Sequence, residues 1–286
     1  MIQSMTGFGK AFMQLPNKKI TVEIKSLNSK GLDLNVRTPS IYREMELQIR
    51  NSIAQRLERG KIDFSLYIEV TGEETSAKIN VPIVKGYINQ MKEVIPNADE
   101  TELMKMAVRM PDALKTEREE LDKNEWLQIE KVINEALDNI STFRSDEGVS
   151  LEKEFELRIS NIENLMNEAV SYDSERVETV KTRLRTALEE LKATIDENRF
   201  EQELIFYLEK YDITEERVRL GNHLNYFLET MKNEEALGRK LGFITQEIGR
   251  EINTMGSKSN HTEMQKLVVQ MKDELEKIKE QVLNVL

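Results

Sequence analysis

The sequence predicts an α+β fold: an N-terminal antiparallel sheet with a covering helix, followed by a large, mostly α-helical region that ends in a heptad-patterned helical hairpin. Two patterns support this prediction. Apolar and polar residues alternate over much of the first 71 residues, as in half-buried strands, whereas beyond Pro82 apolar residues recur at steps of three and four, as on one face of a helix. The 286 residues, 39% hydrophobic and 33% charged, are typical of a globular chain.

The N-terminal part contains three predicted strands and one predicted helix. Residues 19–27 and 32–36 alternate apolar and polar side chains, and the Asn, Ser, Lys and Gly of 28–31 suit a tight turn, so we expect these strands to form a hairpin. Apolar residues at helical spacing over 42–57 predict the covering helix. Alternation returns over 61–71 and predicts the third strand.

The rest of the chain is expected to be helical. Breaks are predicted at 96–97, 111–112 and 145–150, where residues that favour turns occur together. The last of these breaks divides the chain into an N-terminal α+β domain with a helical extension, 1–150, and a C-terminal helical domain, 151–286.

The two ends of the helical region show the clearest signals. A capping-box pattern at 212–215 opens a helix that is expected to run through Met231. The apolar residues of the last helix follow steps of four and three: Met264, Val268, Met271, Leu275, Ile278, Val282 and Val285. This heptad seam must bury itself against another helix, either of this chain or of a second copy.

Charge is distributed unevenly along the chain. The net charge of -11 argues against a protein that coats nucleic acid indiscriminately. Residues 1–70 nevertheless carry a net +4 and residues 239–286 a net +1, which leaves -16 on residues 71–238. Two ends could therefore face a polyanion while the acidic middle is repelled from it. Alternatively, the acidic helices serve solubility alone.

The sequence lacks the motifs that are typical of several function classes. Without cysteine and with two histidines, the chain offers poor ligands for zinc, and it contains no Walker loop, dinucleotide-binding glycine motif or esterase motif. No apolar run approaches the roughly 20 residues needed to span a bilayer, so we expect no membrane association and a cytoplasmic location. Phe8, Phe12 and Tyr42 match no RNA-recognition pattern and are expected in the core.

Residues 239–261 contain more functional polar groups than a plain helix requires. Glu247 and Glu251 lie one turn apart on one helical face, beside Arg250 and Asn253. Two stacked carboxylates next to a lysine-bearing turn could form a metal or phosphate site. The alternative is an exposed helix whose Glu and Arg residues pair with each other or with solvent.

The turn after this helix is a candidate phosphate site. We expect Gly256 to end the helix in a left-handed conformation, and Asn260 with Glu263 to cap the heptad helix. Backbone amides at that helix start, together with Lys258 and the hydroxyls of Ser257 and Ser259, would suit a phosphate oxygen. The alternative is that these residues are present only because helical hairpins need turn residues.

Short blocks at both ends of the chain carry a family resemblance. They are Ser4 to Gly9, Glu23 with Ser26 and Asn28, Arg37 with Pro39, Gly60 with Lys61, 212–216, 219–223, 238–241, 246–247, 250–254, 256–259 and 276–282. These blocks resemble the YicC/YloC family of bacterial endoribonucleases. Residues 72–140 match that family only in general helical character.

The resemblance implies an endoribonuclease that cleaves RNA with help from a divalent metal, Mn²⁺ or Mg²⁺, and a homohexamer that encloses RNA in a central channel. Glu247 and Glu251 would hold the metal as catalytic residues. His223 would be a proton shuttle, or alternatively a packing histidine. The residues expected to contact RNA are Arg239, Lys240, Arg250, Asn253, Ser257, Lys258, Arg37 and Asn28, with Glu23 as a further candidate. Two other classes stay open, namely an RNA-binding adaptor without catalysis and an oligomeric scaffold.

Overall fold

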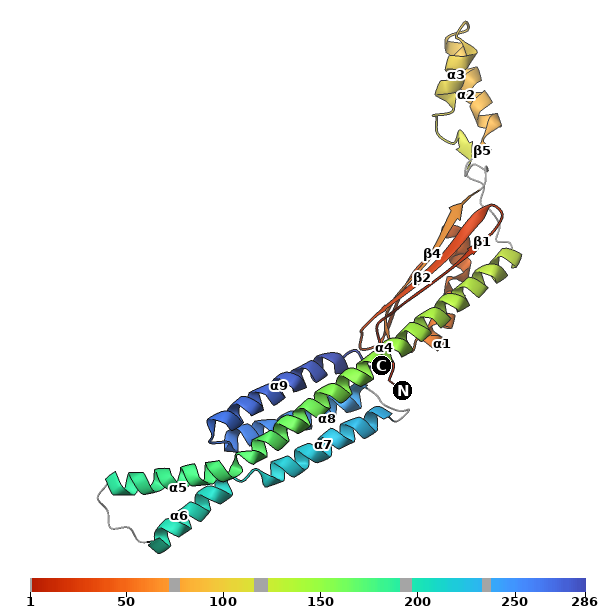
Figure 1. Cartoon of the computed structure of the whole chain (residues 1–286). Coiled ribbons are helices and arrows are strands. Elements are labelled where there is room, and N and C mark those ends of the chain that lie inside the picture. Colours follow the sequence, from red (N-terminus) through yellow and green to blue (C-terminus); the bar gives the residue numbers. More distant parts are fainter. Residues whose placement is uncertain (1, 72–77, 116–122, 191–196, 233–237) are drawn as a thin grey trace.

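The computed structural model describes residues 2–71, 78–115, 123–190, 197–232 and 238–286. The molecule is elongated, and a single long helix, α4 (Lys123–Ser171), runs through its centre (Figure 1). The first half of α4 lies along a sheet, and the second half lies among other helices. This arrangement confirms the predicted α+β class.

The sheet is mixed rather than antiparallel. Its strands are β1 (Gly7–Gln14), β2 (Lys18–Leu27), β3 (Leu32–Arg37) and β4 (Gly60–Val70), in the spatial order β1-β2-β4-β3. β1 and β2 are antiparallel, as are β2 and β4, whereas β3 runs parallel to β4. The expected hairpin of 19–27 and 32–36 is therefore wrong, because β4 lies between these strands.

The physical reason is the crossover between β3 and β4. The 3-10 helix η1 (Ser40–Met45) and helix α1 (Glu46–Arg56) connect the two strands, and such a connection returns the chain to the same end of the sheet, where it can only pair in parallel. The hairpin in this sheet is instead formed by β1 and β2, where the Leu15 amide donates to the Lys18 carbonyl. The sequence pattern did not identify β1.

Helices cover one face of the sheet only. α4 packs against β1 and β2, and α1 lies beside β3. Alternate strand residues such as Ile20, Val22 and Ile24 are buried against Ile49 and Ile53 of α1 and the apolar side of α4. Tyr42 is buried as expected. The prediction is wrong for Phe8 and Phe12, which are exposed on the opposite face.

Helix α4 passes without a break through 145–150, so the predicted break there is wrong. Ser145 and Ser150 donate their hydroxyls to carbonyls one turn earlier, so these side chains bond within the helix rather than to a turn. Gly148 lets the N-terminal segment approach, since a Cβ there would lie 2.0 Å from the Ile2 carbonyl oxygen. The division of the chain at 150 stays a prediction.

The C-terminal body packs the second half of α4 with α7 (Thr214–Lys232), α8 (Gly238–Lys258) and α9 (Thr262–Val282). The helix predicted at 214–231 is confirmed. Asp212 accepts hydrogen bonds from the Thr214 hydroxyl and amide, which hold the pKa of Asp212 below its usual value. The whole heptad seam of α9 is buried against α4 and α8, so its partner is this chain.

Smaller elements extend the molecule at both ends. One lobe contains β5 (Lys78–Ile79), α2 (Val81–Val94), α3 (Glu100–Ala107) and β6 (Leu114–Lys115), and the other contains α5 (Asp173–Glu190) and α6 (Glu197–Lys210). Within the described ranges, no helix has the length and apolar character needed to cross a membrane.

Both chain ends meet at the middle of α4, between the two bodies (Figure 1). The Met5 amide donates to the Asn284 carbonyl, and the Leu286 amide donates to the Gln3 carbonyl. Arg144 of α4 is buried there and donates to the Met5 carbonyl and to the Ser26 hydroxyl. This junction joins the sheet body to the helical body.

Candidate functional site

Helix α8 has one buried and one exposed face. Its buried residues include Leu241, Ile244, Ile248, Ile252 and Met255. Its exposed residues include Gln246, Glu247, Arg250, Asn253 and Ser257. These exposed positions follow one another at steps of one, three and four, so they form a continuous stripe along the helix, here called the α8 stripe. The structure therefore brings four of the predicted site residues, Glu247, Arg250, Asn253 and Ser257, onto one surface.

The two predicted carboxylates lie in different surroundings. Glu247 is half exposed and lies 3.9 Å from Arg250, a surface contact that adds little stability. Glu251 is only 5% exposed, and its side chain has no hydrogen bond or ion pair with any residue that the structure describes. The enclosed polar atoms without a hydrogen-bond partner in the described part of the chain include Oε2 of Glu216 but neither carboxylate oxygen of Glu251. One member of the pair is thus half exposed and the other is almost fully buried.

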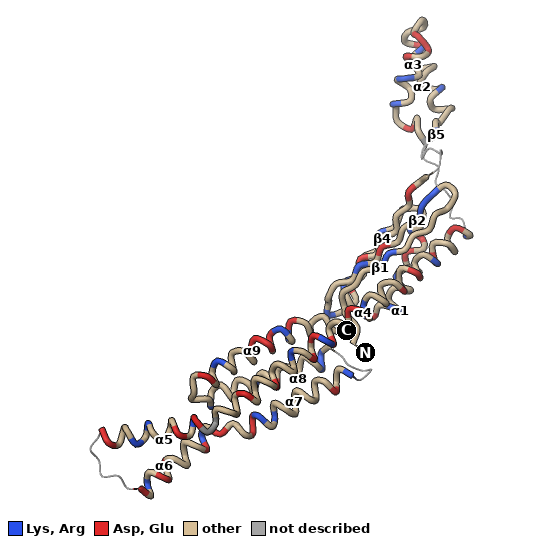
Figure 2. The backbone as a smooth tube through the Cα atoms, viewed as in Figure 1, with Lys and Arg blue, Asp and Glu red and all other residues tan. Residues whose placement is uncertain are grey.

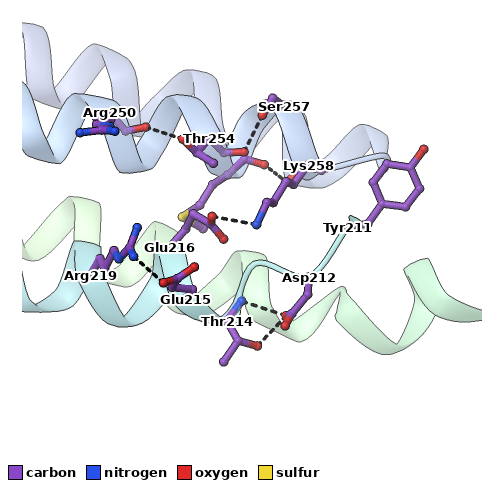
Figure 3. Close-up of polar contacts among 12 residues, drawn as sticks. Tyr211, Asp212, Thr214, Glu215, Glu216, Arg219, Arg250, Thr254, Ser257 and Lys258 are labelled. Carbon is purple, nitrogen blue, oxygen red and sulfur yellow. Dashed lines mark hydrogen bonds and ion pairs between the residues drawn. The ribbon is translucent and has the colours of Figure 1, made fainter. Parts of the chain in front are cut away.

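Lys258 forms an ion pair that joins α8 to α7 (Figure 3). Its ammonium lies 2.8 Å from Oε1 of Glu216, whose side chain is almost fully buried. The second oxygen of Glu216, Oε2, is buried and has no hydrogen-bond partner among the described residues. Lys258 therefore holds the end of α8 against the start of α7 in addition to any contact with phosphate.

Glu216 is absent from the residues predicted for the site. A signal for it exists in the sequence, because Glu216 lies one turn before Leu220 and two turns before Leu224 on the apolar side of α7. A glutamate at a core position is unusual and suggests a specific role. The lysine that accompanies it is 42 residues away, which no local pattern could reveal.

The ion pair also aligns His223 with Glu251. α7 and α8 are neighbouring helices that run antiparallel, since the end of α8 contacts the start of α7 through Lys258 and Glu216, and the start of α8 contacts the second half of α7 through Lys240 and Tyr226 (Figure 1). From the Lys258–Glu216 pair, His223 lies about 10 Å forward along α7, and Glu251 lies about 10 Å back along α8. Both residues therefore occupy the same level of the hairpin. His223 is half buried there.

The predicted end of α8 is wrong in two respects. Gly256 does not adopt a left-handed conformation and lies within the helix, where a Cβ would approach Val268 of α9 to 3.0 Å. Asn260 does not cap α9, because the N-cap residue is His261, which makes no side-chain capping bond. Glycine at 256 therefore serves the close contact between the helices rather than the turn.

Side chains of α8 and α9 beside the turn form hydrogen bonds with backbone carbonyls. The Gln265 amide donates to the Gly256 and Ser259 carbonyls at 2.5 and 2.7 Å. The Ser257 hydroxyl donates to the Thr254 carbonyl at 2.8 Å, and Figure 3 shows this bond on the outer side of α8. The hydroxyl of Ser257 can still accept a hydrogen bond from a ligand, but its proton is committed to the helix.

The other predicted residues lie along the path from α8 to the sheet. Arg239 and Lys240 are exposed at the start of α8, where the Lys240 ammonium lies 5.2 Å from the centre of the Tyr226 ring. The Asn28 side chain donates to the Leu283 carbonyl at 2.5 Å, at the junction of the two bodies. Arg37 lies further away on the open face of the sheet, in the row that contains Ser65.

Charge around the α8 stripe is mixed. Figure 2 shows basic and acidic positions interspersed along α7, α8 and α9 rather than separated into two faces. Among the described residues, no three His, Asp or Glu side chains are grouped closely enough to enclose a metal ion. The stripe therefore offers pairs of groups rather than a closed cage.

Comparison with known proteins finds matches over both halves of the chain. The family described as "Endoribonuclease YicC-like, N-terminal region" matches residues 2–153, and "Endoribonuclease YicC-like, C-terminal" matches residues 169–286. A protein from Clostridioides difficile (strain 630), named "Probable endoribonuclease YicC", is 34% identical over 293 residues, with 100% of both chains covered. A protein of the same name from Haemophilus influenzae is 29% identical over 292 residues, again with 100% of both chains covered.

Proposed function

The chain belongs to the family of YicC-like endoribonucleases, and from this membership we propose that it cleaves RNA at internal phosphodiester bonds along the α8 stripe. The observation that carries the proposal is the full-length match to relatives named as probable endoribonucleases. The surface supports it chemically, since Arg250 and Asn253 are exposed beside two carboxylates that differ in burial.

A divalent cation, Mg²⁺ or Mn²⁺, fits Glu247 and Glu251 as a largely hydrated ion. Mg²⁺ usually keeps several waters and binds through one or two carboxylates, so it requires no enclosing cluster of protein ligands. Glu247 and Glu251 lie one turn apart on α8, a spacing at which both carboxylates can approach one hydrated ion. When bound, the ion would supply charge stabilisation at the phosphate and a more acidic water.

The remaining chemistry is assigned to residues of the chain. Arg250 and Asn253 bind and orient phosphate oxygens from the exposed stripe, and Arg239 with Lys240 extends this contact toward the junction. His223, at the level of Glu251, holds or moves a proton during cleavage, since an imidazole can do both near neutral pH. Lys258 fixes α8 through Glu216 and thereby keeps these groups aligned.

A cleavage assay tests this assignment. Labelled RNA is incubated with the purified chain in Mn²⁺, Mg²⁺ or EDTA, and Glu247→Gln and Glu251→Gln are each expected to slow cleavage by roughly 100-fold or more. Glu156→Gln, which removes an exposed glutamate from α4, is the matched control and should cleave normally. Unchanged cleavage by both α8 variants would exclude the metal assignment. Tight, salt-sensitive binding without any cleavage would instead support an RNA-binding adaptor.

We further propose that the active form is a homohexamer with RNA in a central channel, as the family resemblance implies. The heptad seam of α9 is filled within the chain, so contacts between copies must use other surfaces. Light scattering should then give about 200 kDa, six times the 33.3 kDa of one chain. A 33.3 kDa particle at micromolar concentration would exclude the channel and the scaffold alternative.

A further inference from the structure

The sheet has one face that no helix of the chain covers. Because side chains alternate across a strand, this open face is formed by every second residue of each strand. Its central residues are Phe8, Lys10, Phe12, Thr21, Glu23, Lys25, Arg37, Asp63, Ser65 and Tyr67. The opposite face is closed by α4 and α1.

Three aromatic rings on this face are exposed to solvent. The exposed fractions are 41% for Phe8, 61% for Phe12 and 53% for Tyr67. Phe8 and Phe12 lie on the same side of β1, about 13 Å apart, and Tyr67 lies in the row of Phe12, about 10 Å away across β2. Each ring therefore stands alone rather than contributing to one continuous apolar patch.

Basic side chains accompany the rings. The ammonium groups of Lys19 and Lys25 lie 5.1 and 5.8 Å from the centres of the Phe12 and Phe8 rings. Neither lysine forms an ion pair with a described residue, and the same holds for Arg37. Arg37 lines a hollow of about 210 Å³ together with Lys25 and Tyr67, and the lining also includes Ser65 and two acidic residues, Glu23 and Asp63. Lys10 pairs with Glu23. Cations that are free to meet phosphates thus lie directly beside exposed rings.

We propose that the open face of the sheet is a platform for single-stranded RNA, on which unpaired bases stack against Phe8, Phe12 and Tyr67. Lys19, Lys25 and Arg37 contact the phosphates between these bases. Exposed rings combined with unpaired cations are the composition of surfaces that bind single strands without reading sequence. The proposal rests on the proposed function, because the RNA held here is the strand delivered to the α8 stripe.

A second copy of the chain fits this face less well. The centres of interfaces between proteins are depleted in charged residues, whereas here Lys25 lies beside Phe8, and the charged row of Lys10 and Glu23 lies between the rows of Phe8 and Phe12. Paired RNA is also a poor fit, because its bases are stacked on one another and are not available to side chains. An unpaired strand offers bases that can stack on the rings and phosphates that can contact the cations.

The test measures binding apart from cleavage. Fluorescence anisotropy with a labelled, unstructured RNA in EDTA should show at least a 10-fold loss of affinity for the double variant Phe8→Leu, Phe12→Leu. The double variant Phe8→Tyr, Phe12→Tyr retains the rings and should bind like the wild type. Phe206→Leu removes an exposed ring from α6 and is the matched control. Ultraviolet crosslinking should join RNA to the peptide that contains Phe8 and Phe12.

The outcomes separate this proposal from the proposed function. Normal binding and cleavage by the leucine variant would overturn the platform and leave the nuclease assignment intact. A wild type that binds RNA through Phe8 and Phe12 but never cleaves it would support the platform and contradict the nuclease. A leucine variant with normal affinity but reduced particle mass would show an interface between copies and overturn the platform.

Discussion

The two halves of α4 pack against different partners and leave different surfaces for function. In the first half, α4 lies on a single sheet, so the other face of that sheet stays open to solvent. In the second half, α4 lies among α7, α8 and α9, and apolar residues are buried between the helices. The sheet body therefore presents a broad face with rings and cations, whereas the helical body presents a narrow polar stripe.

Buried charges differ between the regions in the same way. Arg144, at the junction, donates only to neutral oxygens and has no carboxylate partner in the described part of the chain, and burial lowers its pKa. Glu216, in the helical body, is paired with Lys258. The junction is therefore held by hydrogen bonds from Arg144 to neutral backbone and side-chain oxygens, whereas the α7–α8 hairpin is held by opposite charges.

The largest effect is expected at the contact between sheet and helix. A Cβ at Gly9 would lie 2.2 Å from the Ala136 carbonyl oxygen, so Gly9→Ala must displace backbone and should cost about 4 kcal/mol. A Cβ at Gly249 meets the flexible ends of two side chains, Leu275 at 3.2 Å and Lys279 at 3.8 Å, so Gly249→Ala should be close to neutral. Helix content in urea follows the unfolding of both bodies, and fluorescence of Trp126, the one tryptophan of the chain, follows that of the sheet body. Equal losses of unfolding free energy in Gly9→Ala and Gly249→Ala would contradict this difference between the two contacts.

The second largest effect is expected at the Lys258–Glu216 ion pair of the helical body. Lys258→Met leaves Glu216 charged and buried without a partner and should cost about 3 kcal/mol. Adding Glu216→Leu removes that charge and should restore most of the loss. Hydrogen exchange of the α7 and α8 amides measures both changes. Failure of the second substitution to restore protection would show that the pair is not the source of the stability.

A smaller loss is expected at the junction. Arg144→Met removes hydrogen bonds to the Met5 and Arg59 carbonyls, but the Ser26 hydroxyl still donates to Met5 at 2.6 Å. Since no buried charge is left behind, the cost should be about 1–2 kcal/mol, measured by urea unfolding. A loss of stability larger than that of Lys258→Met would contradict the expectation that an unpaired, buried Glu216 costs more than the lost hydrogen bonds of Arg144.

The smallest effect depends on pH. Burial alone would raise the pKa of Glu274 in α9, but hydrogen bonds from Asn161, Lys277 and Arg158 hold that pKa down to about 2. The folded state thus gains stability above the unfolded pKa of 4.5 and loses it as the pH falls toward 2. Glu274→Gln should remove about 1 kcal/mol of this dependence. Helix content followed from pH 6 to pH 2 measures it, and an unchanged acid transition would contradict the assignment.

Sequence patterns predicted the elements better than their arrangement. Alternation located β2 and β4, and the heptad seam located α9, because each pattern reports the periodicity of a single element. The parallel pairing of β3 was missed because it depends on a crossover to a distant strand. The predicted break at 145–150 was wrong because serine and glycine residues also occur within helices that need close contacts.

The residues of the candidate sites were likewise predictable where local spacing is sufficient and not predictable where distant residues must meet. The exposed positions of Glu247, Arg250 and Asn253 follow from helical spacing, so the sequence was sufficient to group them. The pairing of Lys258 with Glu216 required the α7–α8 hairpin to form. Phe8 and Phe12 were expected in the core because they match no RNA-recognition pattern; that they lie on the uncovered face of β1 became clear only from the packing of the sheet.

The α+β class, most of the helices and strands, and the family to which the chain belongs can be read from the amino-acid sequence, because these depend on local periodicity and on short blocks of residues. The order of the strands, the continuity of α4, the burial of Glu251 and Glu216, and the exposure of the rings on the sheet became known only from the packing of the folded chain. Burial and pairing are set by residues far apart in the chain, and local spacing carries no information about which distant surfaces meet.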